Sequence, residues 1–232
     1  MNAYQVYVWK DCDMKRSKII LLMGLPFALI LTAGVVFQGL SSLLGKQAGY
    51  LLGFLFYWGF WCLLVPRLLL GRDSFRGLLI DRAQLFSRRN WPAALTFVVI
   101  SGVTVIMYQS GFLRAPWDLI LLAVPFAVIN GLCEESLWRG LYVKAFPGNP
   151  WLGILFPSLG FACWHFVPQM IFPAATGTLP FVLSTIFLGL AYGFIAYRTG
   201  SAKWTAISHS LNGILALSGM LAPSLLALFS TR

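Results

Sequence analysis

Residues 19–40 read IILLMGLPFALILTAGVVFQGL, an apolar run that contains no charged side chain. The hydrocarbon core of a bilayer is about 30 Å thick, so an α-helix needs about 20 apolar residues to cross it. This stretch is long enough to cross, and it is longer than the apolar core of a signal peptide. We therefore interpret it as an uncleaved membrane anchor.

The rest of the chain repeats the same pattern. Of its 232 residues, 59% are hydrophobic and only 10% are charged, which is too few to cover the surface of a soluble domain. Segments of alternating polarity are scarce, which favours helices over strands. The sequence thus predicts an all-α fold, a polytopic transmembrane bundle of about seven to eight helices in a single domain over residues 1–232. The predicted spans are residues 19–40, 48–70, 91–108, 119–142, 151–172, 179–197 and 204–229, the last of them broken near Pro223.

The formal charge of +10 could indicate a nucleic-acid partner, but its distribution indicates topology instead. With the N-terminus in the cytoplasm, the seven spans leave only Lys46, Arg114 and Arg232 outside and place the other fourteen of the 17 Lys and Arg residues inside. This asymmetry follows the positive-inside rule. We expect a multi-pass protein of a prokaryotic inner (plasma) membrane, surrounded by lipid and binding no nucleic acid. Residues 71–90 are expected to form a cytoplasmic loop with a short helix at the membrane interface.

All glutamates and histidines of the chain lie in predicted spans. Glu134 and Glu135 end the fourth apolar run, His165 lies late in the fifth, and His209 lies early in the seventh. A charge at the middle of a bilayer costs about 2.5–3.5 kcal/mol on insertion scales. Two adjacent carboxylates therefore need a polar cavity and partners.

Helix geometry indicates which partners are available. Glu135 and Arg139 are four residues apart and share a helix face, which predicts an ion pair. Glu134 is rotated by about 100° from Glu135, and we expect it to face the interior of the bundle. Phe161 precedes His165 by four residues, so it can brace the imidazole ring.

Two kinds of hydrolytic chemistry fit Glu134, His165, His209 and Asn212, the last of which shares a helix face with His209. The carboxylate could accept a proton from water held by one imidazole, while the other imidazole and the amide donate to the oxyanion. Alternatively, Glu134, His165 and His209 could bind a divalent metal such as zinc. The chain lacks H-E-x-x-H, the usual zinc-protease motif. The same cluster could also serve an ion- or proton-coupled transporter.

Three motifs follow one another along the chain: Glu134-Glu135-x-x-x-Arg139, Phe161-x-x-x-His165, and His209 with Asn212. Gly140 follows the first motif, and Tyr197-Arg198-Thr199-Gly200-Ser201 precedes the third. Over residues 119–217 this arrangement resembles the CPBP family of CAAX proteases and bacteriocin-processing enzymes. That family includes the prenyl-protein endopeptidase that trims CAAX tails.

The resemblance implies an intramembrane endopeptidase that cleaves a peptide bond in a hydrophobic, lipidated or C-terminal tail, reached from the cytoplasmic side. It implies that Glu134 is the general base, assisted by His165, and that His209 and Asn212 form the oxyanion hole. We favour this glutamate-type mechanism, without a cofactor, over a metalloprotease. The alternative within the same family is a non-catalytic immunity or scaffold protein. The implied catalytic set is Glu134, Glu135, His165, His209 and Asn212, supported by Arg139 and Phe161.

The chain departs from the family at one position. The family often places its asparagine four residues after the histidine, where this chain has Gly213, whereas Asn212 stands at the third position. A residue three positions after the histidine and one four positions after it both share a helix face with it. The amide of Asn212 is therefore expected to take the same role.

The depth of His165 in the membrane sets a further constraint. If the fifth span began at residue 151, His165 would lie about 20 Å from the inner surface, too deep to meet Glu134. We therefore predict that the membrane-embedded part of this span starts near Pro157, with residues 151–156 as an interfacial lead-in. Proline is favoured at the first turn of a helix.

Overall fold

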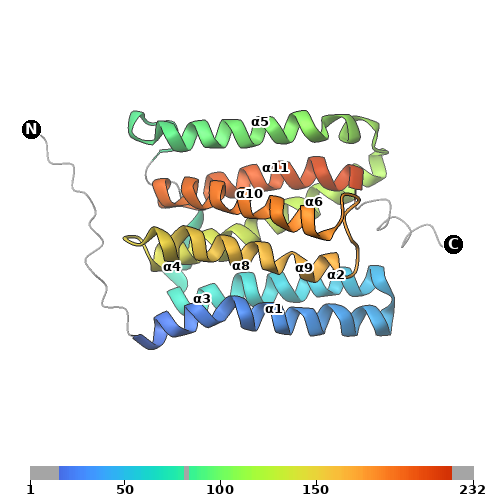
Figure 1. Cartoon of the computed structure of the whole chain (residues 1–232), viewed down its shortest axis with the longest axis horizontal. Coiled ribbons are helices and arrows are strands. Elements are labelled where there is room, and N and C mark those ends of the chain that lie inside the picture. Colours follow the sequence, from blue (N-terminus) through green and yellow to red (C-terminus); the bar gives the residue numbers. More distant parts are fainter. Residues whose placement is uncertain (1–15, 81–83, 221–232) are drawn as a thin grey trace, which may run out of the picture.

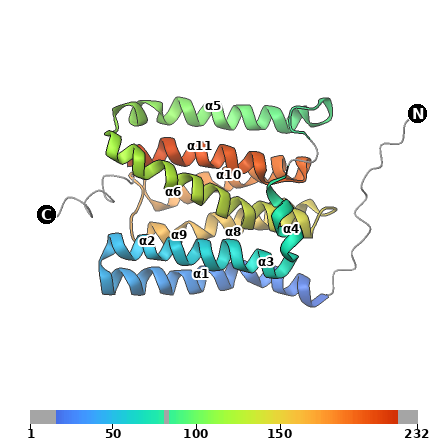
Figure 2. The same cartoon turned by 180° about the vertical axis from the view of Figure 1, so that it is seen from behind.

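A computed structural model describes residues 16–80 and 84–220, and every regular element within these ranges is a helix. The helices lie side by side and run back and forth along one axis (Figures 1 and 2). This arrangement confirms the predicted polytopic helical bundle. The predicted break near Pro223 lies outside the described residues.

Six helical segments of the described chain are long and apolar enough to cross a membrane. A stretch of π-helix interrupts three of them, and a fourth begins with a turn of 3-10 helix. The segments are Arg16–Leu44 (α1), Lys46–Leu70 (α2 Lys46–Phe56, η1 Tyr57–Leu64, α3 Val65–Leu70), Arg88–Arg114 (η3 Arg88–Asn90, α5 Trp91–Arg114), Trp117–Ala145 (α6 Trp117–Glu135, η4 Ser136–Leu141, α7 Tyr142–Ala145), Trp151–Gln169 (η5 Trp151–Leu155, α8 Phe156–Trp164, α9 Phe166–Gln169) and Thr178–Thr199 (α10).

The seventh helix, α11 (Lys203–Met220), corresponds to the start of the seventh predicted span but is not among these six. It packs against α5 and α6 and lies within the bundle (Figure 1). The hydroxyls of Ser101 on α5 and Ser208 on α11 lie 3.0 Å apart and can form a hydrogen bond. Polar side chains of α11 thus face neighbouring helices, which suits a helix that is less apolar than the rest.

Because successive helices are antiparallel, the described Lys and Arg residues separate along the bundle. We call the end where α1, α5 and α11 begin the basic end, at the left of Figure 1, and the other the opposite end. Lys46 and Arg114 lie at the opposite end. The basic end carries Arg16, Lys18, Arg67, Arg72, Arg76, Arg88, Arg89, Lys144, Arg198 and Lys203.

The segment between α3 and α5 covers the basic end. The short helix expected in it is present as α4 (Arg72–Arg76), followed by η2 (Gly77–Leu79). The side chain of Leu78 is buried, and its carbonyl oxygen accepts hydrogen bonds from the Ala202 amide at 2.9 Å and the Ser201 hydroxyl at 3.3 Å. These bonds attach the segment to the start of α11. Its location at a membrane interface stays a prediction.

The fifth span is one helical segment from Trp151, with Pro157 at the second position of α8. It ends at Gln169, three residues before the predicted end. The expected start of its membrane-embedded part near Pro157 stays a prediction.

Glycines allow α1 and α2 to pack closely. Phe37 on α1 packs edge-on against Tyr50 and Phe54 on α2, with ring centroids 6.1 and 5.4 Å apart. A Cβ atom added at Gly53 would lie 2.6 Å from the Phe37 ring, and one added at Gly49 would overlap the backbone of Ser41. Small residues at such positions let helix backbones approach within a membrane.

We expect Gly49→Ala to lower the thermal unfolding temperature of the detergent-solubilised protein, because the new methyl group overlaps Ser41. Overpacking of this kind costs about 1–3 kcal/mol. Gly39→Ala is the matched control, since nothing lies within 4 Å of the added atom. That change should leave the unfolding temperature equal or higher, because alanine favours a helix over glycine by about 0.5–1 kcal/mol. Equal unfolding temperatures for the two variants would contradict the close contact.

Candidate active site

Glu134 lies one residue before the end of α6, and its carboxylate is held by two donors. Its Oε1 accepts a hydrogen bond from the Trp164 indole at 2.8 Å, and its Oε2 accepts one from the Asn130 amide at 3.2 Å. The amide oxygen of Asn130 accepts from the Trp58 indole at 2.9 Å, which leaves its NH₂ group facing Glu134. The residue is only 1% exposed. Helices α6 and α8 therefore fix the direction of this carboxylate.

Trp164 is itself held rigidly. Its ring stacks on that of Tyr57, with centroids 3.7 Å apart and planes at 18°. The Tyr57 hydroxyl accepts a hydrogen bond of 2.8 Å from the Trp138 indole. All three side chains are fully buried. The orientation of the Glu134 carboxylate thus depends on an aromatic layer formed by three separate segments.

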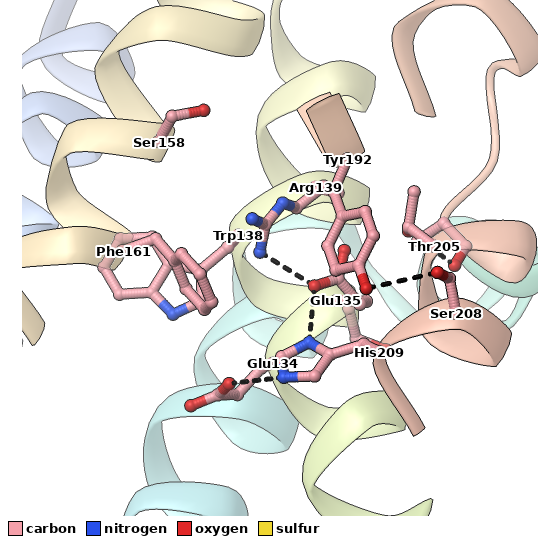
Figure 3. Close-up of polar contacts among 12 residues, drawn as sticks. Glu134, Glu135, Trp138, Arg139, Ser158, Phe161, Tyr192, Thr205, Ser208 and His209 are labelled. Carbon is pink, nitrogen blue, oxygen red and sulfur yellow. Dashed lines mark hydrogen bonds and ion pairs between the residues drawn. The ribbon is translucent and has the colours of Figure 1, made fainter. Parts of the chain in front are cut away.

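Glu135 points to a different side of α6, as the 100° rotation predicts. Its Oε1 accepts hydrogen bonds of 2.8 Å from Nη1 of Arg139 and 2.8 Å from Nδ1 of His209 (Figure 3). The predicted Glu135–Arg139 ion pair is therefore present. The Arg139 guanidinium also lies over the Phe161 ring, 4.1 Å from its centroid, and 5.5 Å from that of Tyr192. Such contacts stabilise a cation removed from water.

His209 joins the two glutamates. Its Nδ1 contacts Glu135, and its Nε2 lies 3.4 Å from Oε2 of Glu134 (Figure 3). An ionised carboxylate can only accept a hydrogen bond, so Nδ1 of His209 carries a proton. The hydrogen bond at Nδ1 thereby orients the ring so that Nε2 faces the carboxylate of Glu134. Glu135 consequently positions His209 as well as pairing with Arg139.

His165 is oriented by its own helix. Its Nδ1 lies 2.7 Å from the backbone oxygen of Phe161, one turn earlier. A carbonyl oxygen only accepts, so Nδ1 is protonated and Nε2 of the neutral ring is an acceptor. The Phe161 ring packs edge-on against the imidazole, with centroids 4.5 Å apart. The bracing contact expected between these residues is present.

A single cavity brings the predicted residues together. The space within it that water can occupy is about 190 Å³, and its walls include Glu134, His165, His209 and Asn212. The fifth span therefore does bring His165 to the same cavity as Glu134. Glu135 does not line the cavity and lies behind His209.

Gly213 explains why the asparagine stands at position 212. A Cβ atom at residue 213 would lie 2.8 Å from the Cβ of Ala127 on α6, so α11 packs there with only a hydrogen atom in between. An asparagine side chain at that position would collide with α6. The neighbouring Asn212 lines the cavity instead.

The side chains of the conditional metal set can be compared with the geometry that a metal ion needs. Within residues 16–80 and 84–220, no group of three or more His, Cys, Asp or Glu side chains is arranged to hold a metal ion. The conditional set of Glu134, His165 and His209 therefore does not form such a group. Both oxygens of Glu134 accept hydrogen bonds, from Trp164 and Asn130.

Three residues of the site were not identified from the sequence. Asn130 and Trp164 contact Glu134, and Tyr192 packs beside His209 with ring centroids 5.8 Å apart. Asn130 precedes Glu134 by four residues, a spacing that could have indicated it. Trp164 and Tyr192 come from other helices, and no local spacing points from them to Glu134 or His209.

We expect Glu135→Gln to lower both the yield and the unfolding temperature of the purified protein. The change removes the counter-ion of a guanidinium that is 1% exposed, and breaking a buried pair in this way costs about 3–5 kcal/mol. Glu134→Gln is the matched control, because it removes a neighbouring charge but keeps the pair with Arg139. It should fold with a smaller loss of stability. Equal unfolding temperatures for the two variants would contradict the structural role of Glu135.

Comparison with known proteins agrees with the geometry. Residues 116–215 match the family described as type II CAAX prenyl endopeptidase Rce1-like. A search of curated proteins and a search of solved structures found no match. The matched range contains all three motifs and every residue of the predicted catalytic set. The match confirms the resemblance to CAAX proteases over residues 116–215 of this multi-pass membrane protein.

Proposed function

We propose that this protein is an intramembrane endopeptidase in which Glu134 activates a water molecule against a peptide bond of a hydrophobic, lipidated or C-terminal tail. The observation that carries this proposal is the cavity, whose walls combine a buried, oriented carboxylate with two imidazoles and an amide. The family match supports proteolysis in general. The role of each residue below is our inference.

Water binding follows from the acceptors that face the cavity. The neutral ring of His165 presents Nε2 as an acceptor, and Glu134 presents its carboxylate. A water molecule can donate one hydrogen to each and direct a lone pair at a carbonyl carbon. Two hydrogen bonds, from the Trp164 indole and the Asn130 amide, keep the Glu134 carboxylate from rotating away from the cavity.

In the first step, Glu134 accepts a proton from the water while the water oxygen bonds to the carbonyl carbon. The carbonyl π bond opens, and its electron pair becomes an oxyanion. In the second step, the carbon–nitrogen bond breaks and the nitrogen takes the proton from Glu134. The products are a new carboxyl terminus and a new amino terminus, and the carboxylate is regenerated.

Stabilisation of the oxyanion falls to Asn212 and His209. Asn212 lines the cavity, and its side-chain amide has N–H groups that can donate. Since Nδ1 of His209 donates to Glu135, the ring donates to the oxyanion through Nε2 in its imidazolium form. Each such donor contributes about 2.7–4 kcal/mol to transition-state stabilisation in other hydrolases.

Glu134→Gln should lower the turnover number by about 10²–10⁴, because glutamine cannot accept the proton of water. The measurement is cleavage of fluorogenic peptides with apolar tails by the purified protein in nanodiscs. Ser184→Ala serves as control, since its hydroxyl lines the cavity but donates to the backbone oxygen of Phe181 at 2.6 Å. Wild-type turnover in the glutamine variant would refute the role of Glu134. Absence of cleavage by the wild type would favour the non-catalytic alternative.

Asn212→Ala should lower kcat by about 10²–10³ and change KM less, because the lost donor acts on the oxyanion. Adding Gly213→Asn to this variant should not restore kcat, since the new side chain would overlap Ala127. A variant with asparagine only at position 213 that regains wild-type kcat would contradict both the role of Asn212 and the reason for its position.

A further inference from the structure

Basic and aromatic side chains gather where three helices meet at the basic end. The starts of α5 and α11 lie beside the end of α10 there, at the left of Figure 1. We define the aromatic–basic patch by seven residues on these three helices and on the segment that leads into α5. They are Phe86, Arg88, Arg89, Trp91, Arg198, Lys203 and Trp204.

Contacts between the three helices make this patch one continuous surface. Nη2 of Arg198 donates a hydrogen bond of 2.7 Å to the backbone oxygen of Arg89. The Trp204 ring packs edge-on against the Phe86 ring, with centroids 5.4 Å apart. Nζ of Lys203 lies 5.1 Å from the centre of the Trp204 ring. The basic residues are thus held next to exposed aromatic rings rather than scattered over separate loops.

The positive charge of the patch is not balanced by the described carboxylates. All four basic side chains of the patch are exposed, and within residues 16–80 and 84–220 none of them forms an ion pair. The acidic residues of these ranges lie elsewhere: Asp73 on α4, Asp118 at the opposite end, and Glu134 and Glu135 in the core. A bound anion would supply the counter-charge.

The position of the patch along the helices indicates which anion is available. Arg88 begins one candidate membrane span, and Arg198 lies one residue before the end of another. The ends of membrane spans meet the boundary between hydrocarbon and lipid headgroups. Phe86 and Trp91 are 62% and 63% exposed, and aromatic side chains favour that boundary. The patch is thus expected to face lipid phosphates.

The face of α5 next to the patch suits the acyl chains of the same lipid. Leu95, Val98 and Val99 follow Trp91 by one or two helical turns, and all three are exposed. The only charged residue of α5 is Arg114, at its far end. A phospholipid with its phosphate at the patch can therefore lay its chains along an apolar surface.

We propose that the aromatic–basic patch binds an anionic phospholipid such as phosphatidylglycerol. A zwitterionic headgroup brings its own positive charge and gains less from four cations. Each basic residue near an anionic membrane surface strengthens binding by about fivefold. No residue of the patch lines the cavity, so this inference is independent of the proposed function. The bound lipid would join the end of α10 to the starts of α5 and α11.

Thermal unfolding of the full-length protein in detergent tests the choice of lipid. Phosphatidylglycerol and phosphatidylcholine with the same acyl chains are added at equal concentrations. We expect phosphatidylglycerol to raise the unfolding temperature by about 2–4 °C more than phosphatidylcholine does. Equal effects of the two lipids would overturn the proposal. Glycerol phosphate, which lacks acyl chains, should have no effect at the same concentration. A rise equal to that with phosphatidylglycerol would assign the patch to a free anion and overturn lipid binding.

Two double variants locate the site. Arg88→Gln with Arg89→Gln removes two exposed charges of the patch, and Lys46→Gln with Arg114→Gln removes two exposed charges at the opposite end. Native mass spectrometry measures the Kd for phosphatidylglycerol. The first pair should raise it by about 25-fold, and the second pair should leave it unchanged. Equal Kd values for the two double variants would refute the assignment.

A single substitution covers the case in which the first double variant is poorly produced. Lys203→Gln changes an exposed residue of the patch on α11 and leaves the segment before α5 intact. It should raise the Kd for phosphatidylglycerol by about fivefold. A Kd equal to that of the wild type would remove Lys203 from the site and contradict a patch shared by the three helices.

Discussion

The burial of two adjacent carboxylates within an apolar bundle is the constraint on which the rest of the structure depends. Glu134 and Glu135 are 1% and 0% exposed, and every polar contact described around them offsets the loss of water. Glu135 is neutralised by Arg139, whose guanidinium is placed between the rings of Phe161 and Tyr192. Glu134 lies next to a cavity, and its carboxylate is held by an indole and an amide.

These contacts come from separate helices, so they also hold the bundle together. His209 ties α11 to α6 through both carboxylates, and Trp164 ties α8 to α6 through Glu134. Phe161 contacts the rings of both histidines, with centroids 4.5 Å from His165 and 5.9 Å from His209. The groups proposed to do chemistry are therefore also structural. Substitution of one of them is bound to affect the position of the others.

Sequence periodicity predicted what one helix can specify. The apolar runs identified the spans, the spacing of four identified the Glu135–Arg139 pair, and the same spacing identified the contact of Phe161 with His165. The contacts of Glu134 with Trp164 and of Glu135 with His209 join residues 30 and 74 positions apart. The spacing of residues along one helix cannot predict such contacts, because they depend on how separate helices pack.

A layer of buried side chains toward the basic end, which includes Trp138 and Tyr192, has a consequence for the order of events in turnover. Under the proposed mechanism, this layer keeps water from reaching Glu134 from the basic end of the bundle. The water to be consumed would then enter through the cavity, as the polypeptide does, and an apolar segment bound there would hinder its arrival. Water would therefore bind at Glu134 and His165 before the polypeptide does.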